Sequence, residues 1–506
     1  MRKYIVMFLL LSFLTDTFSQ NQNSVWCFGD SAGIDFSNIA NPIPIQTSMD
    51  GRGSCASISD SIGNLLFYAN SRGGISGNTT RVWNKNHQLM QNGDSIVGEA
   101  WFNEITIIPF PDTPSYFYLF TLGGIAGSSQ TGFYYSILDL SLNGNLGAVI
   151  QKNTPLLNDE MADCVKTVKH GNGRDWWVIA KLSSISLTHI NRFFVFLISP
   201  LGISAPIIHD LGNAVDGDFQ RFSINNIGNK LMLTNTMGLM TEYDFDRCTG
   251  LISNPNNIFT EQTSDFSRLF WEGAYAPNDS LFYVTTTWYS FPNDTSRLLQ
   301  YNLFVPDIPA SCDTLIELKH PVQPSAVRQG PDQKIYISSF YDWGFPGYPY
   351  PDTVYNQYNM NLSVVNSPDI DGVLCNFQPF SFYLGGKRTY WGLPNNPNYE
   401  LGRWVGSPCD TITSGIEEST IINDAEFYVF YHSGWQQLFV NAKNIKGNNS
   451  LLQIFDLSGK EVFSSAKKTQ PPYFTQDVNC SNFANGLYIV SLTTEKERLI
   501  GKFVKK

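Results

Sequence analysis

A unit made of a polar turn and a short aromatic or aliphatic run recurs through the middle of the chain. Asp60-Ser-Ile-Gly-Asn-Leu-Leu-Phe-Tyr68 is one copy, and Pro277-Asn-Asp-Ser-Leu-Phe-Tyr-Val284 is another. The apolar runs begin at residues 65, 116, 176, 231, 281 and 335, so the steps between them are 51, 60, 55, 50 and 54 residues. Such runs are too short for helices and are bounded by turn residues, which predicts β-strands. A step of this length fits one blade of four strands with its turns, which needs roughly 40–50 residues.

Further strand-like runs lie between these marks, at residues 133–139, 193–198, 239–246 and 297–303. One blade cannot bury both of its faces, whereas blades stacked in a ring bury them and protect their edges. We therefore predict an all-β fold, a β-propeller of about seven blades. Six units are countable, and a seventh is expected near Arg388–Leu393, with Val25–Phe28 closing the ring against the last blade. Six or eight blades and an array of small β-sandwiches are the alternatives, although sandwich domains usually run nearer 100 residues.

Six segments of the middle region carry a family resemblance: residues 63–68, 82–87, 168–178, 243–250, 330–336 and 392–395. Through them, residues 25–405 resemble secreted propeller proteins of one group of Gram-negative bacteria, which are related to WD-repeat propellers. This resemblance implies a fold and a surface location, but no shared catalytic motif.

The N-terminus has the three parts of a removable signal peptide. Arg2 and Lys3 supply the positive charge, and residues 5–14 form an apolar run that is too short to span a bilayer. Thr17 and Ser19 are small residues in the positions that signal cleavage after Ser19 requires. We predict a signal peptide at 1–19, the propeller at 20–412, and no transmembrane span in the mature chain.

Residues 413–506 differ in charge from the rest of the chain. They hold ten Lys/Arg against nine Asp/Glu, whereas residues 21–412 hold 21 against 34. Strands are predicted at 426–431, 436–443, 451–456, 473–478, 486–493 and 498–504. About six strands in this length predict a small β-sandwich. An ordinary adhesive β-sandwich is the alternative interpretation of this segment.

Three pieces of this segment carry a second resemblance: residues 454–462, residues 484–490 and the basic end at 502–506. Through them, the segment resembles the type A C-terminal sorting domain of the type IX secretion system. It implies the type IX machinery as a partner, passage across the outer membrane to a secreted or outer cell-surface location, and removal of the tail. The sorting signal would include Gly486, Leu487, Tyr488, Lys502, Lys505 and Lys506.

The net charge of −11 makes nucleic acid an improbable partner, because an acidic surface repels phosphate. The six His and eight Cys are scattered and show no metal-ligand spacing, so no metal-binding or cofactor-binding residue is assigned, and the cofactor stays unknown. P-loop, GxGxxG and GxSxG motifs are absent from the sequence. Export makes a disulfide chemically feasible, but the sequence does not say which cysteines would pair.

A glycosidase needs only one pair of carboxylates for catalysis, so the acidic residues of the propeller are candidates for such a pair. Turn chemistry explains most acidic residues of the repeat equally well, so no catalytic residue is assigned and the question of enzymatic activity stays open. The acidic candidates are Glu104, Glu160 with Asp163, Asp216 with Asp218, and Glu272.

An aromatic stretch at residues 340–358 is the most unusual segment of the chain. Eight or more aromatic rings cannot all be buried in a loop rich in Gly and Pro, and exposed rings stack on sugars or peptides. The alternative is a self-contained loop that packs over the propeller. We expect a recognition surface formed by Tyr341, Trp343, Tyr348 and Tyr350.

The leading functional hypothesis is a non-enzymatic, secreted or surface-exposed propeller that binds a glycan or a protein. A propeller glycosidase or lyase acting on extracellular polysaccharide is the second hypothesis. An envelope structural or gliding-associated component is the third.

Overall fold

The computed structural model divides into two compact units, residues 1–411 and 412–506, and each is described here by itself. The residues described are 21–51, 53–71, 78–98, 103–123, 131–183, 190–212, 219–261, 268–287, 295–341, 354–410, 426–432, 436–456, 459–468, 471–496 and 498–505. The predicted signal peptide and the candidate pair Asp216 and Asp218 lie outside these ranges.

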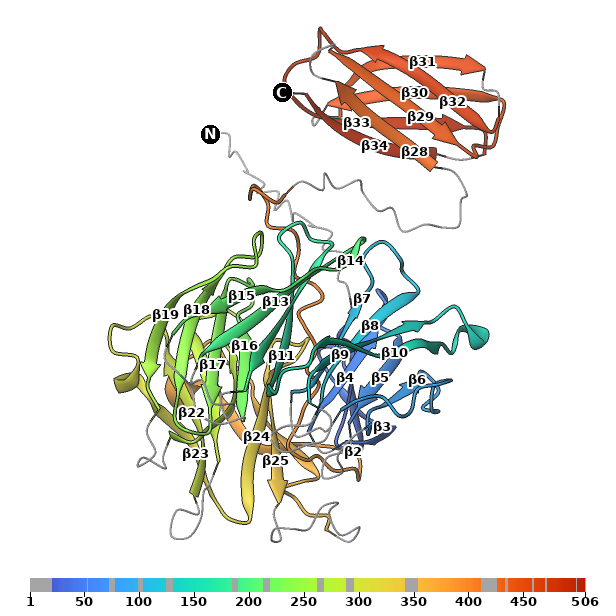
Figure 1. The fold of residues 1–506 in the computed structure, drawn as a ribbon. Coiled ribbons are helices and arrows are strands. Elements are labelled where there is room, and N and C mark those ends of the chain that lie inside the picture. Colours follow the sequence, from blue (N-terminus) through green and yellow to red (C-terminus); the bar gives the residue numbers. More distant parts are fainter. Residues whose placement is uncertain are drawn as a thin grey trace, which may run out of the picture. The chain divides into compact units, whose positions relative to one another are not determined.

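Seven antiparallel sheets make up the described part of the first unit (Figure 1). The first two sheets are β1(Val25–Phe28)-β2(Asp30–Asp35)-β3(Ile43–Asp50) and β4(Cys55–Ser59)-β5(Leu65–Asn70)-β6(Arg81–Asn84). The third is β7(Ile105–Pro109)-β8(Tyr116–Leu122)-β9(Phe133–Asp139)-β10(Ala148–Leu157). The fourth is β11(Met161–Lys169)-β12(Trp176–Leu182)-β13(Arg192–Ser199), which both β14(Gly202–Ile203) and β15(Ile207–Asp210) extend.

The last three sheets each have four strands, and short 3₁₀ turns η1(Asn143–Asn145), η3(Pro309–Ser311) and η4(Gly372–Cys375) accompany the strands. The fifth sheet is β16(Gln220–Ile224)-β17(Lys230–Asn235)-β18(Met240–Phe245)-β19(Ile252–Phe259). The sixth is β20(Phe270–Tyr275)-β21(Leu281–Thr286)-β22(Thr295–Asn302)-β23(Asp313–Lys319). The seventh is β24(Val322–Gln329)-β25(Ile335–Tyr341)-β26(Asn361–Val365)-β27(Phe377–Tyr383).

The sheets follow one another around a closed ring. Their first strands β4, β7, β11, β16, β20 and β24 contact each other in that order, so they line the axis. The first sheet closes the ring on both sides. Trp26 packs edge-on against Tyr336 with ring centroids 5.8 Å apart, and Val25 accepts a hydrogen bond from Ser57 Oγ at 2.7 Å. The architecture is a seven-bladed β-propeller, as the repeat predicted.

Asx turns explain why each repeat reverses where it does. Asp60 Oδ1 accepts the backbone N–H groups of Ile62 and Asn64 at 3.0 and 2.9 Å, while Gly63 adopts φ +95°, which suits a residue without a side chain. Asn225 plays the same part before β17, where its Oδ1 accepts the N–H groups of residues 229 and 230. The polar turn of each unit thus joins the first strand of a blade to its second.

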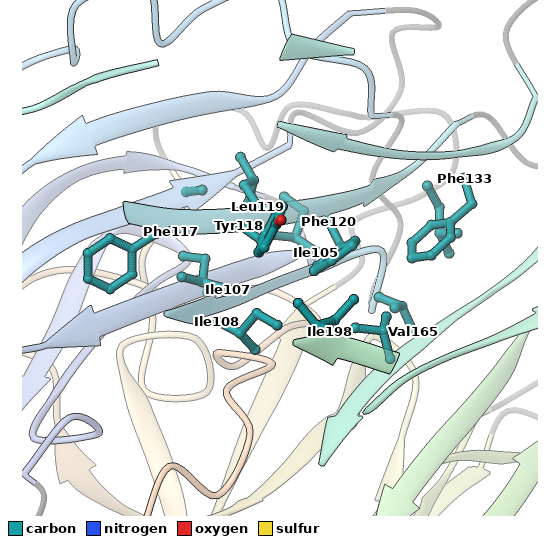
Figure 2. Close-up of a cluster of buried hydrophobic side chains, with 14 of the residues drawn as sticks. Ile105, Ile107, Ile108, Phe117, Tyr118, Leu119, Phe120, Phe133, Val165 and Ile198 are labelled. Carbon is teal, nitrogen blue, oxygen red and sulfur yellow. The ribbon is translucent and has the colours of Figure 1, made fainter. Parts of the chain in front are cut away.

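Apolar side chains between neighbouring sheets hold the blades together. In Figure 2, Ile107 and Phe117 of the third sheet and Val165 and Ile198 of the fourth belong to one buried cluster. Phe67 of β5 joins it through an edge-on contact with Phe117, with ring centroids 5.2 Å apart. Burial of the apolar side chains of these strands therefore stabilises the packing of one blade against the next.

The six predicted runs are the second strands of six blades, β5, β8, β12, β17, β21 and β25, and the runs between them are third strands. The expectation of a seventh unit at Arg388–Leu393 is wrong, because no strand forms there. The N-terminal strands β1–β3 supply the seventh sheet, and residues 391–396 lie between β24 and β4 at the axis. Trp391 O accepts Ala326 N–H at 3.0 Å, and Cys55 O accepts Asn395 N–H at 2.8 Å.

The second unit is a two-sheet β-sandwich. One sheet is β28(Glu426–His432)-β29(Gln437–Lys443)-β32(Tyr473–Asn479). The other is β31(Glu461–Lys468)-β30(Asn449–Asp456)-β33(Gly486–Thr494)-β34(Arg498–Lys505). Its core is apolar, with Leu438, Val440, Leu452 and Ile454 fully buried. Strand β31 is the one element that the six predicted strand ranges omitted.

Within the residues described, no helix has the length and apolar character needed to cross a bilayer.

Candidate ligand-binding site

A layer of buried charges fills the axis of the ring. Asp163 on β11 pairs with Arg221 on β16 at 3.0 Å, and their side chains are 0% and 1% exposed. Burial raises the pKa of Asp163 well above its ordinary value, Arg221 opposes this shift, and a hydrogen bond with the neighbouring carboxyl of Glu104 adds to it. Burial and the neighbouring carboxyl therefore favour the protonated form of Asp163, whereas Arg221 favours its ionised form.

A second ion pair completes this layer. Arg328 on β24 binds Glu272 on β20, and both side chains are largely buried. Asn103, which precedes β7, donates to Glu272 Oε1 at 2.9 Å and accepts from Arg328 Nη2 at 2.8 Å. Since β7, β20 and β24 come from three different blades, these bonds connect the ring across its axis.

The predicted carboxylate candidates are thus brought together, but inside the protein. Glu104, Asp163 and Glu272 are 0%, 0% and 2% exposed. A glycosidase needs one carboxyl as an acid and another as a nucleophile or base, both in contact with the sugar. Here the two arginines and Asn103 bind Asp163 and Glu272, and Glu104 forms a hydrogen bond with Asp163. Among the described residues, Glu160 has no ion pair and no side-chain hydrogen bond, and it lies half-buried directly before β11.

Residues 388–404 cross the axis next to the charged layer. Asn395 donates to the carbonyls of Ile105 and Val165 at 3.0 and 2.9 Å, which joins β7 to β11. Tyr399 continues the path, because its hydroxyl donates to Ile107 O at 2.8 Å and its carbonyl accepts Lys169 Nζ at 2.9 Å. The segment leaves the ring at the β11–β12 turn, and the disulfide Cys248–Cys409 follows.

An aromatic tract, defined here as Phe219, Trp271, Phe340, Trp391, Tyr390 and Tyr355, lies at the end of the ring where β16 and β20 begin and β25 ends. The ring centroids of Phe219 and Trp271 are 6.5 Å apart, those of Trp271 and Trp391 are 6.2 Å apart, and those of Trp391 and Phe340 are 4.3 Å apart. The tract is buried in its middle and open at its ends, where Phe219 is 40% exposed and Tyr355 is 44% exposed.

Arg388 holds the second half of the aromatic tract in place. Its guanidinium lies 4.4 Å from the ring centroid of Tyr355 and 5.6 Å from that of Tyr390, within cation–π range. Asp30 accepts from Arg388 Nε at 2.9 Å, and Val354 O accepts from Nη1 at 3.0 Å. Because this arginine is 2% exposed, the orientation of Tyr355 is set by a buried anchor.

Of the four predicted recognition residues, the structure describes one. Tyr341 is half-buried at the end of β25, directly after Phe340 of the tract, and stacks on Tyr358 at 6.2 Å with an interplanar angle of 8°. Trp343, Tyr348 and Tyr350 lie outside the described residues.

The predicted sorting residues divide between core and surface. Tyr488 is 3% exposed and stacks on Phe503 at 5.2 Å, and its hydroxyl donates to Ala484 O at 2.7 Å. Lys505 is 6% exposed, and its ammonium donates to the carbonyls of Cys480, Ser481 and Phe483 at 2.8, 3.1 and 2.7 Å. Gly486, Leu487 and Lys502 are half-buried on β33 and β34, and Lys506 lies outside the described residues.

Sequence reasoning did not find Phe219, Tyr355 or Arg388. Their contacts join residues far apart in the chain, such as Arg388 with Asp30, and no local pattern marks such pairs. A weak signal existed in the run Arg388-Thr-Tyr-Trp391, which places a cation beside two rings.

Residues 436–506 of this chain match a protein family described as "Secretion system C-terminal sorting domain". No curated protein matches the sequence. Among solved structures, the chain is similar to the Dos1 propeller at 11% identity, with 75% of this chain and 73% of that chain covered and a TM-score of 0.37.

Two further solved structures are similar to the chain. One is the periplasmic gluconolactonase PpgL of Pseudomonas aeruginosa, at 10% identity, 80% and 96% coverage and a TM-score of 0.36. The other is an auxiliary nutrient binding protein from Bacteroides thetaiotaomicron, at 11% identity, 57% and 66% coverage and a TM-score of 0.33. These scores carry no argument, and the propeller assignment depends on the strand order given above.

Proposed function

We propose that this chain, a β-propeller with a type IX secretion sorting domain that directs it to the cell surface or beyond, binds an extracellular glycan at its aromatic tract. The observation that carries the proposal is the pair of open ends of that tract, Phe219 and Tyr355, which are fixed by a buried Trp271 on one side and a buried Arg388 on the other.

Rigid, partly exposed rings suit carbohydrate because the apolar face of a sugar stacks on them while its hydroxyls stay hydrated. Little conformational entropy is lost on binding, since the neighbours of both rings already fix their positions. The predicted residues Tyr341, Trp343, Tyr348 and Tyr350 extend this surface in the proposal, because Tyr341 follows Phe340 of the tract directly along β25.

The acidic residues at the axis of the ring are buried, which favours a binding function for the propeller over a hydrolytic one. A hydrolase at this site would need Glu104, Asp163 or Glu272 to contact a sugar, and each has less than a few per cent of its surface exposed. If the tract bound a protein in place of a glycan, a glycan array would show no binding by the native chain.

The test is a glycan array probed with the native protein and with Phe219→Ala, Tyr355→Ala, Trp343→Ala and Tyr348→Ala variants. We expect binding to a defined glycan set and an at least tenfold loss in the Phe219 and Tyr355 variants. Phe304→Ala is the matched control, because Phe304 is also an exposed ring, at 75%, but belongs to the β22–β23 connection. Equal binding by the native chain and the four tract and loop variants, or no glycan bound by the native chain, would overturn the proposal.

A further inference from the structure

A cavity of about 190 Å³ lies on the other side of the charged layer from the aromatic tract, among the later parts of β11, β16, β20 and β24. Asn396, Asn398 and Tyr399 of the axial segment form its remaining wall. Drug-sized ligands occupy roughly 300–1,000 Å³, so this cavity is suited to one small polar molecule.

Lys166 supplies the cavity with an ammonium group, and Glu400, whose pKa is raised by burial, is the carboxyl group among the lining residues. Its ammonium donates to Asn395 Oδ1 at 2.5 Å, and the structure shows no ion pair for it among the described residues. An ammonium has three N–H donors, so two of them remain for a ligand. Arg328 also lines the cavity, although Glu272 and Asn103 already bind its guanidinium.

The groups around Lys166 disfavour the protonated form of its side chain. Burial lowers the pKa of the Lys166 ammonium well below its ordinary value, the positive charge of Arg328 lowers it further, and Glu272 only partly opposes them. A carboxylate placed beside this ammonium would reverse the shift, because an opposite charge at short range favours the protonated lysine.

The rest of the lining is suited to hydroxyl groups. Seven of its residues are amides: Asn23, Asn225, Asn226, Asn396, Asn398, Gln329 and Gln333. Internal hydrogen bonds already engage both the nitrogen and the oxygen of the Asn225, Asn396 and Asn398 amides, so contacts to hydroxyl groups fall chiefly to Gln329 and Gln333. Gln329 Nε2 donates to Gln333 Oε1 at 2.9 Å, which orients the amide nitrogen of Gln333 away from that bond.

From this combination we infer that the cavity binds a hexuronate, a sugar ring carrying one carboxylate, with the carboxylate on Lys166 and the hydroxyls on the amides. The sugar comes either as a free monosaccharide or as the terminal residue of an acidic oligosaccharide. This site is separate from the aromatic tract and does not depend on the proposed function.

The experiment is isothermal titration calorimetry of the full chain with D-galacturonate, D-glucuronate, tri-galacturonate and D-glucose. We expect at least one uronate to bind and glucose not to bind. If only the trisaccharide binds, the source is the end of a chain; if the monosaccharide binds equally, the free acid is sufficient.

Lys166→Met should weaken uronate binding at least tenfold, because it keeps the length of the side chain but removes the charge. Lys152→Met is the matched control. Lys152 lies on the outer strand β10, where it pairs with Asp94, and it does not line the cavity. Gln333→Asn provides a second variant on an exposed turn, and it keeps a residue type that tolerates the φ of +64° found there. We expect it to weaken binding severalfold.

The inference is overturned if no uronate binds to the native chain, or if folded Lys166→Met and Gln333→Asn variants both bind as tightly as the native protein. Phe219→Ala and Tyr355→Ala should bind uronate normally, so failure here is distinguishable from failure of the glycan surface at the aromatic tract.

Discussion

The ring and the sandwich bury different kinds of side chain at their centres. The sandwich core is apolar, with leucines, valines and isoleucines facing each other between two sheets. At the axis of the ring, Asp163, Arg221, Glu272 and Arg328 are buried together with a chain segment that is not part of any strand. Two packed sheets meet across one dry interface, whereas the first strands of a ring face one another across a space that polar groups can fill.

This difference predicts that the two units respond differently to the loss of one polar side chain. Removing one partner of a buried ion pair leaves a charge without compensation, which typically costs about 3–5 kcal/mol.

The largest effect is expected for Arg328→Met, which leaves Glu272 buried without its cation. The free energy of unfolding of the propeller should fall by about 3–5 kcal/mol. Urea unfolding followed by tryptophan fluorescence measures it, since nearly all Trp residues precede residue 411. Arg297→Met, which breaks the exposed pair with Glu317, should cost at most about 1 kcal/mol. A loss from Arg328→Met no greater than that from Arg297→Met would contradict the comparison.

Loss of the disulfide should have the next largest effect. Cys248→Ser with Cys409→Ser opens a link across a sequence separation of 161 residues, and we expect a loss of about 2–4 kcal/mol. Thermal unfolding with and without reductant checks this value. Cys312→Ser, at an exposed free cysteine, serves as the control and should leave the midpoint unchanged. If reductant lowers the midpoint of the double variant as much as that of the native chain, the assignment fails.

In the sandwich, Lys505→Met should cost less, about 1–3 kcal/mol, because it leaves neutral carbonyls without a donor and no buried charge unpaired. Hydrogen exchange should become faster around residues 480–483, which the ammonium holds. Lys468→Met, at an exposed position on β31, is the matched control. Unchanged exchange in the Lys505 variant would show that this ammonium is dispensable for the loop.

The smallest effect is a pH dependence of the propeller. Asn172 N–H donates to His170 Nδ1 at 3.0 Å, so the ring is neutral and its Nε2–H donates to Cys248 O at 3.1 Å. Burial lowers the pKa of His170 below its ordinary value of 6.5. The unfolded chain therefore binds more protons than the folded chain between that lowered pKa and 6.5, so stability falls as the pH drops through this window.

Unfolding midpoints measured from pH 7.5 to 5 should show this fall, and His170→Gln should reduce its slope. Burial also lowers the pKa of His87, so adding His87→Gln should flatten the curve further. A slope that is the same in the native chain and both variants would remove histidine as the cause.

The strands were predictable and the contacts at the axis were not. A local pattern of a polar turn followed by an apolar run predicts each second strand, such as β5 or β21. Glu104, Asp163 and Glu272 could be named as candidates, but not their arginines, because Arg328 and Asn103 are 225 residues apart in sequence. The same reason hid the crossing by residues 388–404, whose run of Asn and Pro resembles an ordinary linker.

The disulfide between Cys248 and Cys409 affects what would happen to the propeller if the sorting domain were removed. It attaches the chain to the fifth blade just before the stretch that leads to the sorting domain. A peptide bond broken beyond residue 410 would therefore create a new chain end that stays tethered beside the ring. The residues that fill the axis would keep their positions, and the exported propeller would stay folded without its sorting domain.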